Sequence, residues 1–325
     1  MPRMVTAILV LAALVAAVTL VTQWGAAEHV RRIEAAYPPR GQIVTVDGRD
    51  VHVIVEGSGP DLVLIHGAGG NAQDFTHAFT RRLTARYRVF AVDRPGLGYT
   101  DRARPGLNAA WTTAAETPTE QARLLAEATR QLGAERPIVL GHSYGASVAM
   151  AWALEEPAAG IVVVSGATMP WPGPLQPYYR VFGSLLGSAL AAPLVTAFVP
   201  EDRVRRSLSG VFAPAPVDPT YFEGAAVPLA IRTGTFRANA RQVKSLRPTL
   251  VEKSARYREI TLPVEILHGT ADTTVRTEIH AEPLAASLPN ATLTVLEGVG
   301  HAPHQTHPEP VVEAIDRVAE RAGLR

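Results

Sequence analysis

The chain begins with an apolar stretch that differs from everything after it. No charged residue occurs from Met4 to Trp24, and Val5 to Val21 is almost entirely Val, Leu, Ile and Ala. An apolar run of about 18 or more residues can span a bilayer as a helix. A helix buried in a protein core would carry a polar face, which this run lacks. We therefore predict a membrane anchor over residues 1–25.

A cleaved signal peptide is the alternative for this segment. Signal peptides usually have a shorter apolar region, of about 7–15 residues, although Gly25-Ala26-Ala27 offers the small residues of a cleavage site. Arg3 favours a cytoplasmic N-terminus, whereas Arg31 and Arg32 favour the reverse. We expect the catalytic body on the extracytoplasmic side, because N-terminal anchors resemble secretory signals. Residues 26–40 are predicted to be a polar linker that is helical in part.

Beyond the linker, short apolar runs alternate with helical patterns. Gln42–Val46 and Asp50–Glu56, separated by the turn at Asp47-Gly48, predict a hairpin. The later runs are continuously apolar, as is typical of strands buried on both faces. They cover Leu62–Ile65, Tyr87–Val92, Pro137–Leu140, Ile161–Val164, Leu262–Leu267 and Thr292–Leu296. This alternation predicts an α/β fold with a mostly parallel sheet and helices on both faces.

The clearest helix signal follows the second of these strands. Thr117 and Glu120 form the pattern of a capping box, Pro118 suits the first helical position, and Gly133 suits the end. Ala122, Leu125, Thr129 and Leu132 fall on one face. Helices are also expected near Thr274–Leu288 and Pro308–Ala322.

The alternation stops at about Ala167. Residues 168–258 are rich in Pro, Leu, Ala and aromatics and contain no strand-like run of comparable strength, while Leu185–Val199 reads as helical. We predict a core of residues 41–167 and 259–325, interrupted by a helical lid over residues 168–258.

Composition excludes several classes of function. The 325 residues carry a net charge of +1 without a basic run of five, so the electrostatic signature of nucleic-acid binding is missing. The chain has no cysteine, which excludes disulfides, a cysteine nucleophile and thiolate metal sites. The sequence does not specify an oligomeric state.

The strongest chemical motif is Gly141-His142-Ser143-Tyr144-Gly145, which directly follows one buried strand and precedes a helix. In G-x-S-x-G the serine lies on a strained strand-to-helix turn, so the residues two before and two after it must be small. The helix N-terminus adds N–H groups where negative charge develops. This context predicts Ser143 as a nucleophile, and we expect the side chain of His142 to point away from it.

A second glycine-rich turn, His66-Gly67-Ala68-Gly69-Gly70, follows the first buried strand. A backbone N–H from this turn, together with that of Tyr144, would form an oxyanion hole. Ala68 is the first choice and Gly69 the second. The turn lacks the G-x-G-x-x-G of dinucleotide sites and the G-K-[ST] of phosphate loops.

Two later strands are followed by the remaining candidates. Asp272 ends His268-Gly269-Thr270-Ala271-Asp272, and His301 lies in a glycine-flanked loop. The chain order Ser143, Asp272, His301 is the order expected for the triad of this fold type. Asp93, which precedes Ser143 in the chain, reads as a structural residue. His304 and His307 are assigned to the loop and to the start of the last helix rather than to a metal site.

These motifs, with His66-Gly67 and the segment Asp93-Arg94-Pro95-Gly96-Leu97-Gly98, resemble the α/β-hydrolase superfamily in its serine esterase-like branch with a helical lid. The resemblance covers roughly residues 42–167 and 260–322. It implies an eight-stranded sheet, a lid between strands six and seven, and neither a metal nor an organic cofactor. Epoxide hydrolases and haloalkane dehalogenases of this fold use an aspartate nucleophile, which Ser143 argues against.

We expect an enzyme that hydrolyses a carboxylic ester or similar acyl bond of an apolar small molecule through an acyl-enzyme. The apolar substrate is suggested by lid residues of the kind that line pockets: Met169, Trp171, Tyr178, Tyr179 and Phe182. A cofactor-free C–C bond hydrolase or perhydrolase and an acyltransferase share the same triad and stay open as alternatives. A catalytically inactive binding protein on this fold is the alternative of another class.

Overall fold

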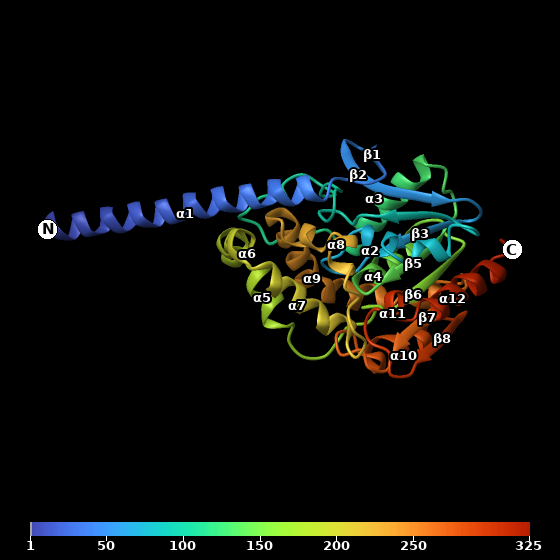
Figure 1. Ribbon diagram of the computed structural model, residues 1–325. Coiled ribbons are helices and arrows are strands. Elements are labelled where there is room, and N and C mark those ends of the chain that lie inside the picture. Colours follow the sequence, from blue (N-terminus) through green and yellow to red (C-terminus); the bar gives the residue numbers. More distant parts are fainter. Residues whose placement is uncertain (1) are drawn as a thin grey trace.

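A computed structural model describes residues 2–325 (Figure 1). Within these residues the strands form one eight-stranded sheet in the order β1-β2-β4-β3-β5-β6-β7-β8. Their bounds are β1 Gln42–Val46, β2 Arg49–Gly57, β3 Asp61–Ile65, β4 Arg88–Val92, β5 Ile138–His142, β6 Gly160–Val164, β7 Val264–Gly269 and β8 Ala291–Leu296. The predicted fold class is confirmed, and each predicted strand lies within two residues of an observed one.

Only β2 runs against the rest of the sheet. It pairs antiparallel with β1 and β4, whereas the pairings from β3 and β4 through β8 are parallel. The central strands β5 and β6 are buried along their whole length. Because parallel strands all end at the same edge, the loops after β3, β5, β7 and β8 meet there.

Helices cover both faces of the sheet. On one face lie α3 (Pro118–Gln131), α4 (Tyr144–Glu155) and α10 (Thr277–Ser287), and on the other lie α2 (Gln73–Thr76), the 3-10 turn η1 (Thr80–Arg82) and α12 (Pro308–Arg321). The predicted capping box is present at α3, where the Glu120 N–H donates to Thr117 Oγ1 at 3.2 Å and the Thr117 N–H donates to Glu120 Oε2 at 2.7 Å.

The segment between β6 and β7 is helical. It contains α5 (Pro177–Phe182), the π-helical turn η2 (Gly187–Ala191), α6 (Ala192–Phe198), α7 (Glu201–Phe212), α8 (Tyr221–Gly224), the 3-10 turns η3 (Val227–Ile231) and η4 (Tyr257–Glu259), and α9 (Thr233–Ser254). Leu246 and Leu250 of α9 join the main hydrophobic core. We refer to residues 168–258 as the lid.

Buried polar residues tie the lid to the core. The Arg94 guanidinium donates to Gln121 Oε1 on α3 and to Gln242 Oε1 on α9, both at 3.0 Å. Gln242 in turn donates to the buried Glu116 at 2.9 Å. Each of these buried groups is hydrogen-bonded, as its burial requires.

The N-terminal helix α1 (Pro2–Ala36) runs through the segment predicted as an anchor and continues into the segment predicted as a partly helical linker. It is one continuous helix that projects from the body with its apolar part exposed (Figure 1). Within the linker segment Ala26 and Ile33 are buried, because α1 packs against α6 and η3 of the lid. Length and composition make α1 a candidate membrane span, and a signal sequence would meet the same criteria.

Candidate active site

Ser143 lies on a strained turn between β5 and α4. Its backbone adopts φ 53° and ψ −117°, outside the regions that L-residues prefer. A side chain at Gly145 would collide with the carbonyl oxygen of Ile65, and one at Gly141 would collide with the carbonyl oxygen of Gly145. The two glycines of the motif are therefore required by close backbone approach, as the sequence pattern indicates.

The structure brings the three predicted polar residues into one chain of hydrogen bonds. His301 Nε2 lies 2.9 Å from Ser143 Oγ, and His301 Nδ1 lies 2.7 Å from Asp272 Oδ2. All three residues are buried, with 5–8% of their surface exposed. They follow β5, β7 and β8, so the common edge of the parallel sheet assembles them from distant parts of the chain.

Asp272 is fixed on both of its oxygens. The N–H groups of Thr274 and Val275 each donate to Oδ1 at 2.9 Å, and His268 Nε2 lies 3.3 Å from Oδ2. Burial opposes ionisation, but the hydrogen bonds from His268 and His301 outweigh it and hold the pKa of the Asp272 carboxyl below its usual value. A carboxylate held in this way fixes the imidazole orientation and can stabilise an imidazolium.

Asp93 has different partners, in agreement with its predicted structural role. Its carboxylate accepts the N–H of Ala72 at 2.6 Å and of Tyr99 at 2.8 Å, and lies 2.7 Å from Nδ1 of the buried His52. Burial opposes its ionisation, yet the hydrogen bond from His52 lowers the pKa of Asp93. The residue joins two loops to β2 rather than contributing to the chain at Ser143.

The loop after β3 lies against the nucleophile. A Cβ placed on Gly67 would be 3.1 Å from Ser143 Cβ. Ala68, Gly69 and Tyr144 line the same cavity as Ser143. The Gly69 N–H already donates to Asn239 Oδ1 of α9 at 2.8 Å, which favours Ala68 over Gly69 as an oxyanion donor. Tyr144 begins α4, where backbone N–H groups have no partner inside the helix.

The side chain of Tyr144 has a separate role. Its ring lies under the Arg94 guanidinium, 4.2 Å from the ring centre, and its hydroxyl accepts a hydrogen bond from Gln121 at 3.2 Å. Burial raises the pKa of this phenol to about 12, so Tyr144 stays protonated and serves packing. Only its backbone N–H remains a candidate for the site.

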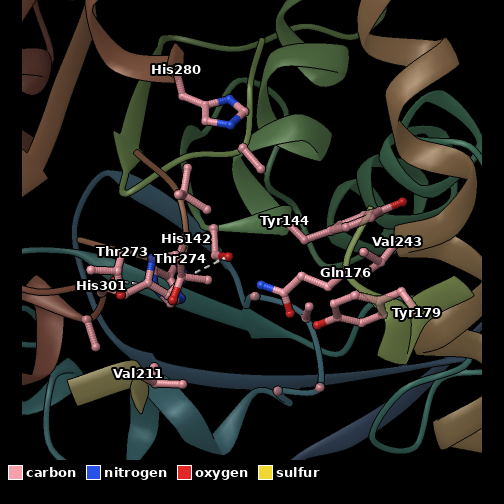
Figure 2. Close-up of a pocket in the computed structure, with 18 of the residues that line it drawn as sticks. His142, Tyr144, Gln176, Tyr179, Val211, Val243, Thr273, Thr274, His280 and His301 are labelled. Atoms are coloured by element: carbon pink, nitrogen blue, oxygen red, sulfur yellow. Dashed lines mark hydrogen bonds between the residues drawn. The ribbon is translucent and has the colours of Figure 1, made fainter. Parts of the chain in front are cut away.

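A cavity of about 410 Å³ opens in front of Ser143 and His301 and is walled by both the core and the lid. Figure 2 shows His301, Thr273 and Thr274 on one side and Tyr144, Gln176 and Tyr179 on the other. Apolar lid residues supply much of the wall: Trp171, Leu175, Leu208, Val211, Val243 and Leu246. Of the aromatic residues expected there, Tyr178 and Phe182 instead pack against Phe236.

A polar cluster that the sequence did not reveal also borders the cavity. Asp74 lies 3.2 Å from His304 Nε2 and accepts the Tyr221 hydroxyl at 2.6 Å. The rings of His142 and His304 are in contact, tilted by 51° with centres 4.3 Å apart, and His142 Nε2 lies 2.9 Å from the carbonyl oxygen of His301. His142 lines the same cavity as Ser143, with its ring centre 5.0 Å from that of His301. His304 is a buried residue of the short helix α11 (Pro303–Thr306).

Within residues 2–325, Asp74, His142 and His304 are the grouping that could offer ligands to a metal, with ligand atoms within 4.8 Å of one another. The Asp74 oxygens already receive hydrogen bonds from Tyr221, His304 and Gln305. Burial opposes ionisation, but His304 holds the pKa of Asp74 below its usual value. The arrangement fits a hydrogen-bonded wall that joins lid helix α8 to α2 and supports the backbone of His301.

Comparisons with known proteins agree with this architecture. A sequence model of the alpha/beta hydrolase family matches residues 62–314. A Mycobacterium tuberculosis protein described as uncharacterised is 26% identical over 314 residues, which cover 89% of this chain and 84% of that protein. A pimeloyl-acyl-carrier-protein methyl ester esterase from Edwardsiella ictaluri is 29% identical over 275 residues, covering 80% of this chain and 93% of the esterase.

One solved structure shares the fold over nearly the whole chain. The crystal structure of a membrane phospholipase A, described as a bacterial virulence factor, matches with a TM-score of 0.68 and 21% identity, covering 99% of each chain. At this level of identity the match establishes the common fold.

Proposed function

Since the chain belongs to the alpha/beta hydrolase family, we propose that it is a serine hydrolase. The relatives of the chain support hydrolysis of ester bonds. The proposed reaction is cleavage of a carboxylic ester of an apolar small molecule through an acyl-enzyme. The observation that carries this proposal is the hydrogen-bonded chain from Ser143 through His301 to Asp272 at the wall of an apolar cavity. The similarity to an esterase supports an ester as the bond that is cleaved.

The geometry accounts for each step of acylation. His301 Nε2, 2.9 Å from Ser143 Oγ, takes the hydroxyl proton as Oγ forms a bond to the ester carbonyl carbon. The carbonyl oxygen becomes an oxyanion and accepts hydrogen bonds from the N–H groups of Ala68 and Tyr144. When the C–O bond to the alcohol breaks, His301 donates its proton to the leaving oxygen.

Deacylation repeats the same transfers with water. His301 removes a proton from water as the water oxygen attacks the acyl carbon, and it then returns that proton to Ser143 Oγ as the acid leaves. Asp272 remains ionised throughout and stabilises the imidazolium formed twice in each cycle. The strained backbone at Ser143 keeps Oγ exposed to the cavity without a conformational change.

We further propose that α1 stays attached as a membrane anchor and holds the catalytic body on the extracytoplasmic side. Thr22 and Ala26 are buried against the lid, and His29 Nδ1 lies 2.5 Å from the carbonyl oxygen of Thr196. A helix packed in this way is a poor substrate for signal cleavage near Ala27. N-terminal sequencing of the mature protein, with carbonate extraction of the membranes, tests this assignment. A mature chain that begins after Ala27 would contradict it.

The catalytic assignment is tested by labelling the full-length protein with a fluorophosphonate probe. We expect stoichiometric labelling that is abolished in Ser143→Ala. Ser147→Ala is the matched control, because Ser147 lies one turn further along α4 and donates to the carbonyl oxygen of Ala167 at 2.5 Å. Labelling of Ser143→Ala at the rate of the unmodified protein would overturn the proposal.

Substrate assays on the same protein then distinguish hydrolysis from the alternative reactions. Hydrolysis of an ester panel in water supports the proposal. Preferential transfer to added methanol would indicate an acyltransferase, and turnover of C–C substrates without ester turnover would indicate a C–C bond hydrolase.

A further inference from the structure

The lid carries a line of large apolar side chains on its outer surface. Four apolar residues recur at every fourth position from the residue before η2 to the end of α6, which places them on one side. They are Leu186, Leu190, Leu194 and Phe198. Their exposed fractions are 63%, 49%, 44% and 61%. We call these four residues the lid stripe. A continuous exposed apolar patch on a soluble protein surface usually marks a contact with another phase or molecule.

The lid stripe lies where α1 leaves the body. The Cβ position of Gly25 on α1 is 3.6 Å from Ala197 Cβ on α6, and His29 contacts Thr196. Trp24, which directly precedes Gly25, is 68% exposed, and the uncharged run continues outward from it. Tryptophan is enriched at membrane–water interfaces. The stripe is therefore at the level where a membrane-spanning α1 would enter the bilayer.

The orientation of α6 also suits a membrane surface. In Figure 1, α1 runs across the view and α6 is seen nearly end-on beneath its base, so α6 crosses α1 rather than running alongside it. A helix that crosses a membrane-spanning helix at its base lies along the plane of the interface. The exposed Arg180 and Arg203, which precede and follow the stripe in the chain, are of the type that reaches lipid phosphates.

We propose that the lid stripe is inserted into the outer part of the lipid bilayer, beside α1. The stripe lies along η2 and α6, and α6 packs against α1 at the end of its uncharged run. If α1 is an anchor, the bilayer surrounds α1 up to this point. A second copy of the chain would have to cover the stripe without displacing lipid from the adjoining α1. Lipid can cover the apolar surface of α1 and that of the lid stripe at the same time.

The proposed membrane contact also indicates a class of substrate. This part of the inference rests on the proposed function. Tyr179 of α5 lines the catalytic cavity, and α5 leads directly into η2 and the stripe. The same lid segment thus forms a cavity wall and the membrane contact. The ester that fits this arrangement is one dissolved in the bilayer, such as a long-chain acyl ester, which reaches Ser143 without crossing bulk water.

Insertion is measured on the full chain, whose lack of cysteine allows single-site labelling. Leu190→Cys and Leu194→Cys, each spin-labelled in the Ser143→Ala background, are reconstituted in phosphatidylcholine–phosphatidylglycerol vesicles. Val251→Cys is the control, because Val251 is 58% exposed but lies at the opposite end of α9 from α6. We expect severalfold higher collision with oxygen, relative to a water-soluble nickel chelate, at the two stripe sites than at the control.

Collision ratios equal to those of the control would overturn the proposal. Dipolar broadening between stripe labels that persists at high lipid-to-protein ratio would show that a second copy covers the stripe, and would overturn it too. Because these labels are read in an inactive variant, the result does not depend on the proposed reaction.

Delivery of substrate is tested by kinetics. The double variant Leu190→Glu, Leu194→Glu replaces two aliphatic side chains that are exposed on the protein and that the proposal places in lipid. It should therefore lower kcat/KM on a long-chain ester in vesicles by about tenfold. Activity on a soluble short-chain ester should stay within about twofold, as it should for Val251→Glu on both substrates. Equal losses on both esters, or no loss on either, would overturn the delivery step. Absence of fluorophosphonate labelling in the unmodified enzyme would instead refute the proposed reaction.

Discussion

The sheet with its catalytic edge and the outer lid are stabilised in different ways. Strands β5 and β6 are buried throughout, and the polar groups at the edge, such as Asp272, are held by several hydrogen bonds each. By contrast, α5 has no buried residue, and η2 and α6 present large apolar side chains outward. The core therefore buries its apolar side chains among themselves, whereas the outer lid leaves a row of them exposed.

The boundary between the two regions does not follow the chain. Helix α9 belongs to the lid by sequence, but Arg241 donates to the carbonyl oxygens of Leu107 and Ala109, each at 2.9 Å, and Leu246 packs in the main core. Burial lowers the pKa of Arg241 to about 10, which leaves it charged at neutral pH. By its contacts α9 therefore belongs with the core, and the outer lid is the segment from α5 to α7.

The largest expected effect tests whether the core edge acts as one unit. Ser143→Ala and His301→Ala should each lower kcat by about 10⁶, because neither the nucleophile nor the base has a substitute. The double variant should be scarcely worse than either single one. Active-site titration and single-turnover assays measure the losses, and additive losses in the double variant would contradict the shared role.

The second effect separates the two buried aspartates of the core. Asp272→Asn should lower kcat by about 10⁴ while leaving the fold intact, because the amide favours the wrong imidazole tautomer. Asp93→Asn should mainly lower the melting temperature, since Asp93 joins His52, Ala72 and Tyr99. If Asp93→Asn abolishes activity without unfolding, and Asp272→Asn stays active, the triad is misassigned at its third member.

The third effect concerns how the core responds to pH. The fully buried His66 accepts the Arg94 N–H on Nε2 at 3.0 Å, and burial lowers its pKa from 6.5 to about 4. Above pH 6.5 both folded and unfolded states carry neutral His66. As the pH falls toward 4, the unfolded state alone gains the proton, so stability is lost.

At pH 5 this difference corresponds to about 2 kcal/mol of unfolding free energy. Urea unfolding at pH 7 and pH 5 should show a smaller loss in His66→Gln than in the unmodified protein. His307→Gln, at an exposed position, should behave like the unmodified protein. Equal pH dependence in all three chains would show that folding leaves the pKa of His66 unchanged.

The smallest expected effect lies on the lid side of the cavity. Each methylene buried in an apolar pocket contributes about 0.8 kcal/mol, so kcat/KM should rise severalfold as the acyl chain lengthens from two carbons. Leu208→Trp, which fills part of the wall formed by α7, should shift the preferred chain to shorter acids. A flat profile, or a preference for charged acids, would count against an apolar pocket.

Much of the core could be predicted from sequence because its signals are local. A buried parallel strand such as Ile161–Val164 is an unbroken apolar run, and the turn at Ser143 needs small residues at fixed spacing. The placement of Asp272 and His301 follows from the rule that parallel strands end at one edge. These features depend on short stretches of chain and on one topological rule.

The polar cluster at Asp74 could not be predicted in this way. Its partners Tyr221 and His304 come from α8 and α11, and only the folded chain brings them together. The hydrogen bond from Gly69 to Asn239 of α9 is equally non-local, so the sequence could not rank Ala68 above Gly69 on that ground. The one sequence feature that could have pointed to Asp74 is its position as an acidic residue in a partly apolar stretch, between Gln73 and Phe75.

The continuity of α1 gives the anchor a mechanical meaning. Its uncharged run from Met4 to Trp24 is about 32 Å long at 1.5 Å per residue, close to the thickness of a bilayer core, and a spanning helix in a thinner bilayer tilts. Because α1 runs unbroken past this segment and packs on α6, any tilt is carried into the lid before it reaches the sheet. Over 30 Å, a tilt of about 10° displaces one end of a rigid helix by about 5 Å relative to the other. In a membrane-inserted state we therefore expect a change of tilt to move α6 and η3, and η3 carries the cavity-lining Val227. The thickness of the bilayer would then affect the shape of the pocket.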